Sequence, residues 1–412
     1  MQTTTIGRGR LSKAALAVGA VVIAILPATV PVASSPAQAA PTAPPASTEP
    51  ALSRVGGSDR FETSVQISQS VFSDDEWTVG PEVDEPRVAR VVYLATGRGF
   101  ADALSAAPAA AHLGGPLLLS DTTAVPPVVL DEIERLDPDR VVVVGGESSL
   151  SPDVEADVRE ALPDATVDRI AGADRFATSR AIAYDGFVDE AWQQPTPGRP
   201  RDLISLYDPA DRDTFDVSFD DRALFVATGR SFPDALAASA AAGAHDMPVV
   251  LVPGEAAGLD EPTRSLVTDL QPGDLYPVGG PAVMSERIVD ALRSSTPADG
   301  RAHDVVRLAG DDRFGTSHWV AGTAFSTHWG LAYGVDQATE TSVFVASGEN
   351  FPDALAGAAA AGYLRQPLVT SRGACMPVLT FHAVDFQGPD ELVLLGGPAA
   401  LADRVADLGH LC

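Results

Sequence analysis

Three alanine-rich stretches decide the fold of this chain. They are ATGRGFADALSAAPAAA at 95–111, ATGRSFPDALAASAAAG at 227–243 and ASGENFPDALAGAAAAG at 346–362. Each begins at the end of an apolar run, such as 91–95, and a further apolar run and helical segment follow it. Continuous apolar strands that alternate with helices are typical of a parallel sheet buried on both faces. We therefore predict an α/β fold, and we call these stretches the second blocks.

Two further motifs flank each second block, in the same order three times. The first blocks are RVGGSDRFETS (54–64), RIAGADRFATS (169–179) and RLAGDDRFGTS (307–317). The third motif is an apolar run that ends in Gly-Gly: VVVVGGESSLS from Val141, LYPVGGPAVMS from Leu275 and LVLLGGPAALA from Leu392. The repeat is far longer than a solenoid unit, so we expect each copy to hold its own small core.

Repeat one shows the expected elements most clearly. Strands are predicted at 91–95, 116–120 and 141–144, and helices at 100–113, 126–136 and 152–162. Ser151 supplies a hydroxyl that can cap the start of a helix. Pro152 then stands at the first helical position, where the missing backbone N–H of proline costs no hydrogen bond. In the second blocks, Asp102, Asp234 and Asp353 occupy the same position in each repeat. They stand at the start of the predicted helix, where a carboxylate interacts favourably with the positive end of the helix dipole.

The composition excludes several classes of protein. The 412 residues include 56 acidic and 28 basic ones, a formal net charge of −28, yet 45% are hydrophobic, which indicates a folded rather than a disordered chain. An acidic surface repels nucleic acid, so we expect no nucleic-acid partner. Lys13 is the only lysine. Nearly all positive charge is therefore carried by arginine, whose planar fork suits carboxylates and phosphates.

The N-terminus has the pattern of a secretory signal peptide. Arg8, Arg10 and Lys13 precede an apolar run at 14–26, and Ala-Gln-Ala at 37–39 fits a cleavage site. The run is shorter than the roughly 20 residues of a membrane-spanning helix; an uncleaved anchor is the alternative. We assign residues 1–39 to the signal peptide and 40–50 to a Pro/Ala-rich linker. The mature protein is expected to be secreted, without membrane contact.

The two cysteines, Cys375 and Cys412, are predicted to form a disulfide, because export leads to an oxidising environment. Two free thiols or a metal site are the alternatives, but no histidine cluster near them has the spacing of zinc ligands. We expect no metal site and no cofactor.

The sequence lacks the common catalytic motifs. It contains no Gly-x-Ser-x-Gly elbow, no phosphate-binding loop with lysine, no Gly-x-Gly-x-x-Gly after a strand and no His-Glu-x-x-His. A carboxylate of a first block and one of a second block would make an acid/base pair. Three nearly equal copies favour a scaffold or multivalent binding instead. We expect no enzyme, with a peptidoglycan hydrolase of the amidase type, or a modifier of one, as the alternative.

The candidate binding residues are the arginines of the first and second blocks. Those of the first blocks are Arg54, Arg60, Arg169, Arg175, Arg307 and Arg313, beside Asp59, Asp174 and Asp312. They form either Arg–Asp clamps between subdomains or a groove that grips an anionic polymer with bidentate guanidiniums. Arg98 and Arg230 would extend that groove, and Glu349 takes their place in repeat three.

The Gly-Gly turns are expected to need positive φ angles. They are Gly145, Gly146, Gly279, Gly280, Gly396 and Gly397. Each lies between a strand end and a helix start, so a cradle of backbone donors for an anion is the alternative.

Taken together, R-[VIL]-x-G-x-D-R-F-x-T, A-[TS]-G-x-x-F-x-D-A-L and an apolar strand ending in Gly-Gly resemble the cell wall binding repeat, type 2, of exported Gram-positive proteins. The resemblance covers essentially all of 51–412. It implies three Rossmann-like or Toprim-like α/β subdomains in a pseudo-threefold arrangement. It also implies non-covalent attachment to the envelope through an anionic wall polysaccharide.

The resemblance divides the chain into three repeats, 51–166, 167–304 with an insertion at 193–222, and 305–412. Members of the family commonly carry an additional catalytic or adhesive domain, and none is found here, which favours binding without catalysis. Bridging by divalent cations would help so acidic a protein to hold a polyanion. A surface module whose inserted loops recognise envelope proteins is the further alternative.

Overall fold

The computed structural model describes residues 50–72, 88–188, 223–295, 304–325, 341–407 and 411–412. The predicted signal peptide, residues 40–49 of the linker and the insertion 193–222 lie outside these ranges. The described residues all belong to one unit, Thr48–Cys412. They form three four-stranded sheets in which every described strand pair is parallel. The predicted α/β class is confirmed.

The three sheets share one strand order. Sheet 1 consists, from edge to edge, of β3 (Leu117–Ser120), β2 (Val91–Thr96), β4 (Arg140–Val144) and β5 (Thr166–Ile170). Sheet 2 consists of β7 (Val249–Val252), β6 (Ala223–Thr228), β8 (Asp274–Val278) and β9 (Asp304–Val305). Sheet 3 consists of β11 (Leu368–Ser371), β10 (Ser342–Ser347), β12 (Glu391–Leu395) and β1 (Ala51–Val55).

The helices fall into equivalent sets. The second-block helices are α2 (Ala101–Leu113), α6 (Pro233–Ala244) and α10 (Pro352–Tyr363). The first-block helices are α1 (Arg60–Val71), α5 (Arg175–Ala183), which continues as a π-helical turn Tyr184–Val188, and α9 (Arg313–Ala324). The helices before the Gly-Gly strands are α3 (Pro127–Leu136), α7 (Glu261–Leu270) and α11 (Val378–Gln387). After the Gly-Gly turns follow α4 (Pro152–Ala161), α8 (Glu286–Arg293) and the 3-10 turn Asp403–Val405.

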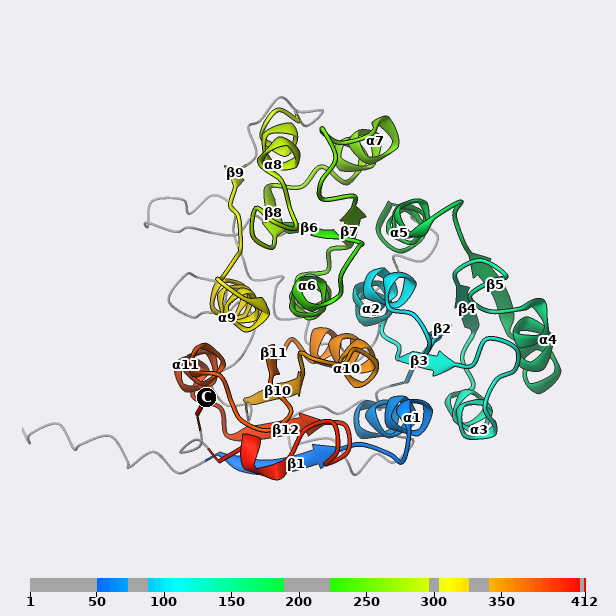
Figure 1. Cartoon of the computed structure of the whole chain (residues 1–412). Helices are drawn as coiled ribbons and strands as arrows, with labels where there is room; N and C mark the ends of the chain where they lie inside the picture. The colour runs from blue at the N-terminus through cyan, green and yellow to red at the C-terminus, as the bar shows by residue number, and fades with distance from the viewer. Residues whose placement is uncertain (1–49, 73–87, 189–222, 296–303, 326–340, 408–410) are drawn as a thin grey trace, which may run out of the picture. The chain divides into compact units, whose positions relative to one another are not determined.

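The last strand of each sheet comes from a neighbouring repeat. β5 and β9 lie just before the turns of the second and third first blocks, yet they pair with β4 and β8 of the preceding repeats. β1 pairs with β12 over its whole length, from Ala51 opposite Glu391 to Val55 opposite Leu395, so the start of the folded chain closes the sheet of its end (Figure 1). The same pairing therefore recurs from repeat one to two, two to three and three to one, in the predicted pseudo-threefold manner.

The second-block helices pack against one another at the centre of these contacts. α2, α6 and α10 are mutual neighbours, as Figure 1 also shows. Small residues allow the close approach: a Cβ on Gly243 would lie 2.8 Å from the Cβ of Ala111 and 3.3 Å from the Cα of Gly362. Ser239 Oγ donates to the carbonyl of Leu104 at 2.8 Å. A helix that is apolar all round is buried, which explains the alanine-rich sequence.

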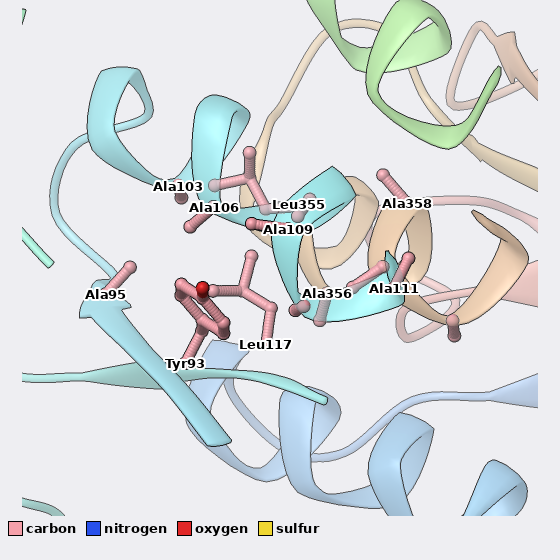
Figure 2. Packing of buried hydrophobic residues seen from close by; sticks show 14 of the residues in the cluster. Tyr93, Ala95, Ala103, Ala106, Ala109, Ala111, Leu117, Leu355, Ala356 and Ala358 are labelled. Atoms are coloured by element: carbon pink, nitrogen blue, oxygen red, sulfur yellow. The ribbon is translucent and has the colours of Figure 1, made fainter. Parts of the chain in front are cut away.

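The three repeats share one large core. One cluster of buried residues contains side chains of all three sheets and of α2, α6 and α10. Figure 2 shows Tyr93 and Leu117 of sheet 1 together with alanines of α2 and with Leu355 and Ala356 of α10. Two smaller clusters lie in repeats two and three. The expectation of a separate core for each copy is therefore met only in part: repeats two and three hold smaller clusters of their own, but the central helices bury apolar surface mutually and join the three repeats in one large cluster.

The predicted elements of repeat one agree with the structure to within one residue at each end. The capping role of Ser151 is an exception. Ser151 is the N-cap residue of α4, but its hydroxyl makes no capping hydrogen bond; it lies 3.5 Å from an oxygen of Asp153 instead. Pro152 at the first helical position is as predicted.

Two glycine substitutions should change stability in opposite directions. Gly243→Ala places a methyl group against Ala111 at the centre, and we expect it to lower the free energy of unfolding by about 1–3 kcal/mol. Gly322→Ala in α9 meets no atom within 4 Å, so its better helix propensity should raise stability by about 0.5–1 kcal/mol. Urea unfolding of both variants measures this, and equal effects would contradict the central packing.

Candidate functional site

Each first block connects two neighbouring sheets. Its strand is the last strand of one sheet, and its helix packs on the next: α1 on β3, α5 on β7 and α9 on β11. The aspartate of the block begins the helix. Asp59 Oδ1 accepts from the N–H groups of Phe61 and Glu62, both at 2.9 Å, and Asp174 and Asp312 do the same in their helices. These aspartates are N-caps, so they do not pair with the arginines beside them.

The threonine and serine of the first block also have structural roles. The Thr63 hydroxyl accepts from the N–H of Gly57 at 3.0 Å, which holds the turn before the helix. The Ser64 hydroxyl accepts from the N–H of Leu119 in β3 at 3.2 Å, which fixes α1 on the sheet. The equivalent residues of the other two blocks make the same bonds. Hydrogen bonds of the backbone thus explain these motif positions.

The first arginine of each block clamps the Gly-Gly turn of the preceding repeat. Arg169 Nη1 donates to the carbonyl of Gly145 at 2.7 Å, and the same side chain pairs with Glu155. Arg307 binds Gly279 and Glu286 in the same way, at 2.6 and 2.9 Å. Arg54 closes the series on Gly396 and Asp403, both at 2.6 Å. These three guanidiniums hold neighbouring repeats together, with acidic partners other than Asp59, Asp174 and Asp312.

The first glycine of each Gly-Gly turn has the predicted positive φ. The angles are 101° at Gly145, 107° at Gly279 and 94° at Gly396. The N–H of each donates to the carbonyl of the neighbouring first-block strand, at 2.8–2.9 Å. Those donors are therefore engaged and cannot cradle an anion. The second glycines, Gly146, Gly280 and Gly397, have no atom within 3.4 Å of a built Cβ.

The second-block aspartates lie beneath the Gly-Gly turns. A Cβ on Gly145 would meet the Asp102 carboxylate at 2.5 Å, and Asp234 and Asp353 stand in the same relation to Gly279 and Gly396. Burial raises the pKa of all three carboxyls, against the opposing effects of a hydroxyl and of an arginine of the next first block. They are thus less readily ionised than the acids of the surface.

Three phenylalanines meet where the second-block helices begin. Phe100, Phe232 and Phe351 precede α2, α6 and α10, and their ring centroids lie 5.6–5.8 Å apart in each of the three pairs. We call them the Phe cluster. Tilted and edge-on aromatic pairs at such distances are favourable. The cluster therefore fixes the junction at which all three repeats contribute one side chain each.

The second arginines of the first blocks bind equivalent glycine carbonyls, and two of them lie beside this cluster. Arg175 Nη1 donates to the carbonyl of Gly229 at 2.7 Å, and its guanidinium carbon lies 5.8 Å from the centre of the Phe100 ring. Arg313 bonds to Gly348 and lies 5.9 Å from Phe232. Arg60 bonds to Gly97 at 2.5 Å. All three residues are exposed, and among the described residues no carboxylate forms an ion pair with any of them.

The arginines of the second blocks differ from this set. Arg98 makes a bidentate pair with Asp121 at 2.8 and 2.9 Å, and Arg230 lies 3.9 Å from Glu255. In repeat three Glu349 accepts from the N–H of Gly373 at 3.2 Å instead. Both arginines are exposed and each lies beside an acidic residue, Asp121 or Glu255. Their predicted part in polymer binding stays a prediction.

The family is decided by the same three blocks. A model of the family described as Cell wall binding domain 2 (CWB2) matches residues 54–155, 169–289 and 307–406. The chain belongs to this family. The first arginine of each block opens each matched segment, so the CWB2 repeat begins on the residue that clamps the preceding one.

Two curated relatives come from Bacillus subtilis (strain 168). This CWB2 chain is 22% identical over 364 residues to N-acetylmuramoyl-L-alanine amidase LytC, covering 88% of this chain and 59% of the relative. It is 27% identical over 198 residues to the Amidase enhancer, covering 48% of this chain and 21% of that protein. The chain thus spans little more than half of one relative and a fifth of the other.

Two solved structures from Clostridium difficile share the fold of this CWB2 chain. Cwp6 superposes with a TM-score of 0.65 and 20% identity, over 88% of this chain and 48% of Cwp6. Cwp8 superposes with a TM-score of 0.64 and 24% identity, over 87% of this chain and 51% of Cwp8. They show that the fold of this chain also occurs in these two solved structures.

The C-terminal disulfide is present as predicted. Cys375 and Cys412 are bonded, with their Cα atoms 5.8 Å apart and 37 residues apart in sequence. A parallel bridge between Met376 and Leu411 lies beside the bond. No cluster of three potential metal ligands occurs within the described ranges, and no described helix is long and apolar enough to span a bilayer.

Sequence reasoning missed the Phe cluster. The phenylalanine recurs in each second block, directly before Ala-Asp or Pro-Asp, and that recurrence was the available signal. The recurrence alone did not predict a cluster, because a residue at the start of a helix faces solvent unless another repeat covers it, and the sequence does not show which repeats meet there. The sequence also did not separate the clamping arginines from those beside the cluster, since both sets occur once in each block.

Loss of a clamping arginine should destabilise the protein more than loss of an exposed arginine of a second block. Arg169→Met removes a half-buried clamp; it leaves the Gly145 carbonyl without this donor and Glu155 with Arg159 as its remaining partner, so we expect a loss of about 1–3 kcal/mol. Arg98→Met removes an exposed pair with Asp121 and should cost at most about 1 kcal/mol. Denaturant unfolding measures both, and similar losses would contradict the clamp.

The buried aspartates predict a pH dependence of stability. The raised pKa of Asp234 means that the folded state binds its proton more tightly than the unfolded chain does. Protonation of Asp234 therefore adds to the free energy of unfolding below pH about 4, and this stabilisation is lost as the pH rises through the raised pKa of the folded state. Asp234→Asn should therefore flatten the fall in stability over that interval.

A surface aspartate supplies a control of opposite sign. The hydrogen bond from Arg98 lowers the pKa of Asp121 to about 2. The ionised Asp121 therefore stabilises the folded state at pH values above the ordinary pKa of an aspartate, and this stabilisation is lost as the pH falls towards the lowered pKa. Asp121→Asn should remove stability at neutral pH but little of it in acid. Thermal unfolding of both variants between pH 3 and 7 tests the two signs; parallel curves would show that neither group is perturbed.

Proposed function

We propose that this chain is an exported protein that attaches non-covalently to the cell wall by binding an anionic envelope polysaccharide through its three repeats. Membership of the CWB2 family supports association with the wall. One observation supports the anionic ligand: Arg60, Arg175 and Arg313 are exposed and form no ion pair with a carboxylate among the described residues, and Arg175 and Arg313 lie beside rings of the Phe cluster.

The charge distribution supports the same site. Most described arginines pair with an acid, as Arg98 does with Asp121 and Arg293 with Asp290. Each arginine beside the Phe cluster gives one N–H to a glycine carbonyl, and a guanidinium has five donors. The N-termini of α2, α6 and α10 begin at the same place, which adds favourable dipoles for an anion. A chain with net charge −28 would thus still hold a polyanion at this junction.

We further propose that the chain binds without catalysis. Its match to LytC extends over 364 residues of a chain in which the three repeats are matched between 54 and 406, and it covers 59% of that amidase. The three equivalent carboxylates lie beneath glycine turns, where Asp234 is buried and Asp102 and Asp353 are half-buried, and they have structural contacts there. Bridging divalent cations are an alternative means of holding the polymer, and specificity for envelope proteins in the insertion 193–222 is an alternative function.

Wall sedimentation tests the proposal. The purified mature chain should co-sediment with isolated Gram-positive walls and lose this binding when the wall polysaccharide is extracted. The triple variant Arg60→Gln, Arg175→Gln, Arg313→Gln should bind at least about tenfold more weakly, because each bidentate contact with an anion is lost. Arg90→Gln, Arg264→Gln, Arg293→Gln changes the charge equally at exposed ion pairs and is the matched control.

Two outcomes would contradict the proposal. Equal sedimentation with intact and polysaccharide-free walls would exclude the polymer as ligand. Equal weakening by both triple variants would show that net charge, and not the Phe cluster, decides binding. Circular dichroism checks that the variants fold, and release of muropeptides from the walls by the wild-type chain would contradict the non-catalytic part. Binding that survives a chelator would exclude cation bridges.

A further inference from the structure

Repeat three presents an exposed aromatic face that has no counterpart on the described helices of the other two repeats. Its residues are Trp319 and His318 of α9 and Leu379, His382 and Phe386 of α11, and we call them the α9/α11 face. Trp319 is 52% exposed, Phe386 is 54% exposed, and Leu379 is 38% exposed. Aromatic side chains of this size at such exposure, on neighbouring helices, are typical of a binding surface.

The residues of this face are joined by contacts between the two helices. A Cβ built on Gly315 of α9 would lie 3.2 Å from Leu379, so Leu379 packs directly on that helix. The His318 and Trp319 rings lie 5.4 Å apart, and Gln387, next to Phe386, donates to the carbonyl of Ala321 at 3.3 Å. Burial and the neighbouring His382 lower the pKa of His318, which keeps this part of the face neutral.

The internal repeats show that the fold does not require these residues. α3, α7 and α11 bury the same third, sixth and seventh positions, so their exposed positions correspond. The position of Phe386 is occupied by Arg135 in α3 and by Asp269 in α7. Counted from the first-block arginine, Trp319 corresponds to Gln66 in α1 and Ala181 in α5. Two units with the same architecture thus have polar or small residues where repeat three has aromatic ones.

The chemistry of the face suits sugar rings. The ring face of Trp or Phe is electron-rich and attracts the C–H groups of a pyranose, while an imidazole exchanges hydrogen bonds with hydroxyls. Over α9 and α11 together the ionisable acids and arginines are Arg313 and Asp385, and Arg313 is bonded to Gly348. An uncharged face repels neither a neutral sugar nor a polyanion, in contrast to the rest of a chain with 56 acids.

We infer that the α9/α11 face of repeat three stacks on sugar rings of the wall polysaccharide and is a second contact for the polymer, distinct from the arginines of the Phe cluster. This inference rests on the proposed function. It assigns neutral sugar rings to Trp319 and Phe386 and leaves the anionic groups of the polymer to Arg60, Arg175 and Arg313. It also makes the three repeats unequal, since one of them carries the stacking face.

Four single variants test the inference with the full mature chain and isolated walls, first digested with protease so that polysaccharide is the remaining ligand. Trp319→Ala and Phe386→Leu should each weaken binding roughly tenfold, as truncation of an aromatic anchor does. Trp319→Phe keeps a ring and should retain most of the binding. Gln66→Ala, at the position in repeat one that corresponds to Trp319, should change nothing. Unaltered thermal unfolding shows that each variant folds.

The outcomes separate the inference from the proposed function. Wild-type binding with unchanged affinity of Trp319→Ala would overturn the inference and leave the proposed function standing. No wild-type binding to protease-treated walls would overturn both. A loss in Trp319→Ala that Phe386→Leu does not share would show that apolar volume, not an aromatic ring, is recognised. An effect of Trp319→Ala on untreated walls alone would assign the face to a wall protein and would overturn the sugar as ligand.

Discussion

The structure depends on the sharing of each first block between two sheets. A strand such as β5 ends in sheet 1, and within a few residues α5 packs on sheet 2. The turn between them is fixed by the aspartate N-cap and by a threonine hydroxyl that accepts from a glycine N–H. Because β1 occupies the same place in sheet 3, the last repeat is completed by the first, and no repeat has its full sheet without a neighbour.

This sharing explains how the arginines are used. A guanidinium at the end of the shared strand reaches the Gly-Gly turn of the sheet that it joins, and its donors are taken up by backbone carbonyls and an acid. A guanidinium at the start of the shared helix points to the junction of the repeats, where the Phe cluster lies. One motif therefore contains a clamp and a candidate ligand contact six residues apart, as Arg169 and Arg175 show.

The threefold repetition restricts the residues of the central helices more than those of the outer helices. The alanines and glycines of α2, α6 and α10 meet each other, so a change in one repeat affects contacts with two others. The outer helices α3, α7 and α11 keep their buried positions and vary freely where they are exposed. Repeat three differs from the others in the aromatic α9/α11 face and in the disulfide between Cys375 and Cys412.

The sequence by itself determined the class, the elements of repeat one, the positive φ angles of the Gly-Gly turns and the pairing of two cysteines. Local patterns suffice for these features, because apolar runs, prolines and glycines act within one element. It did not determine that β1 pairs with β12, that the cores merge, or which arginine of each block clamps its neighbour. Those depend on contacts between different elements, which join residues from 24 positions apart, as Arg169 and Gly145, to 342 positions apart, as Arg54 and Gly396, and which only the tertiary structure brings together.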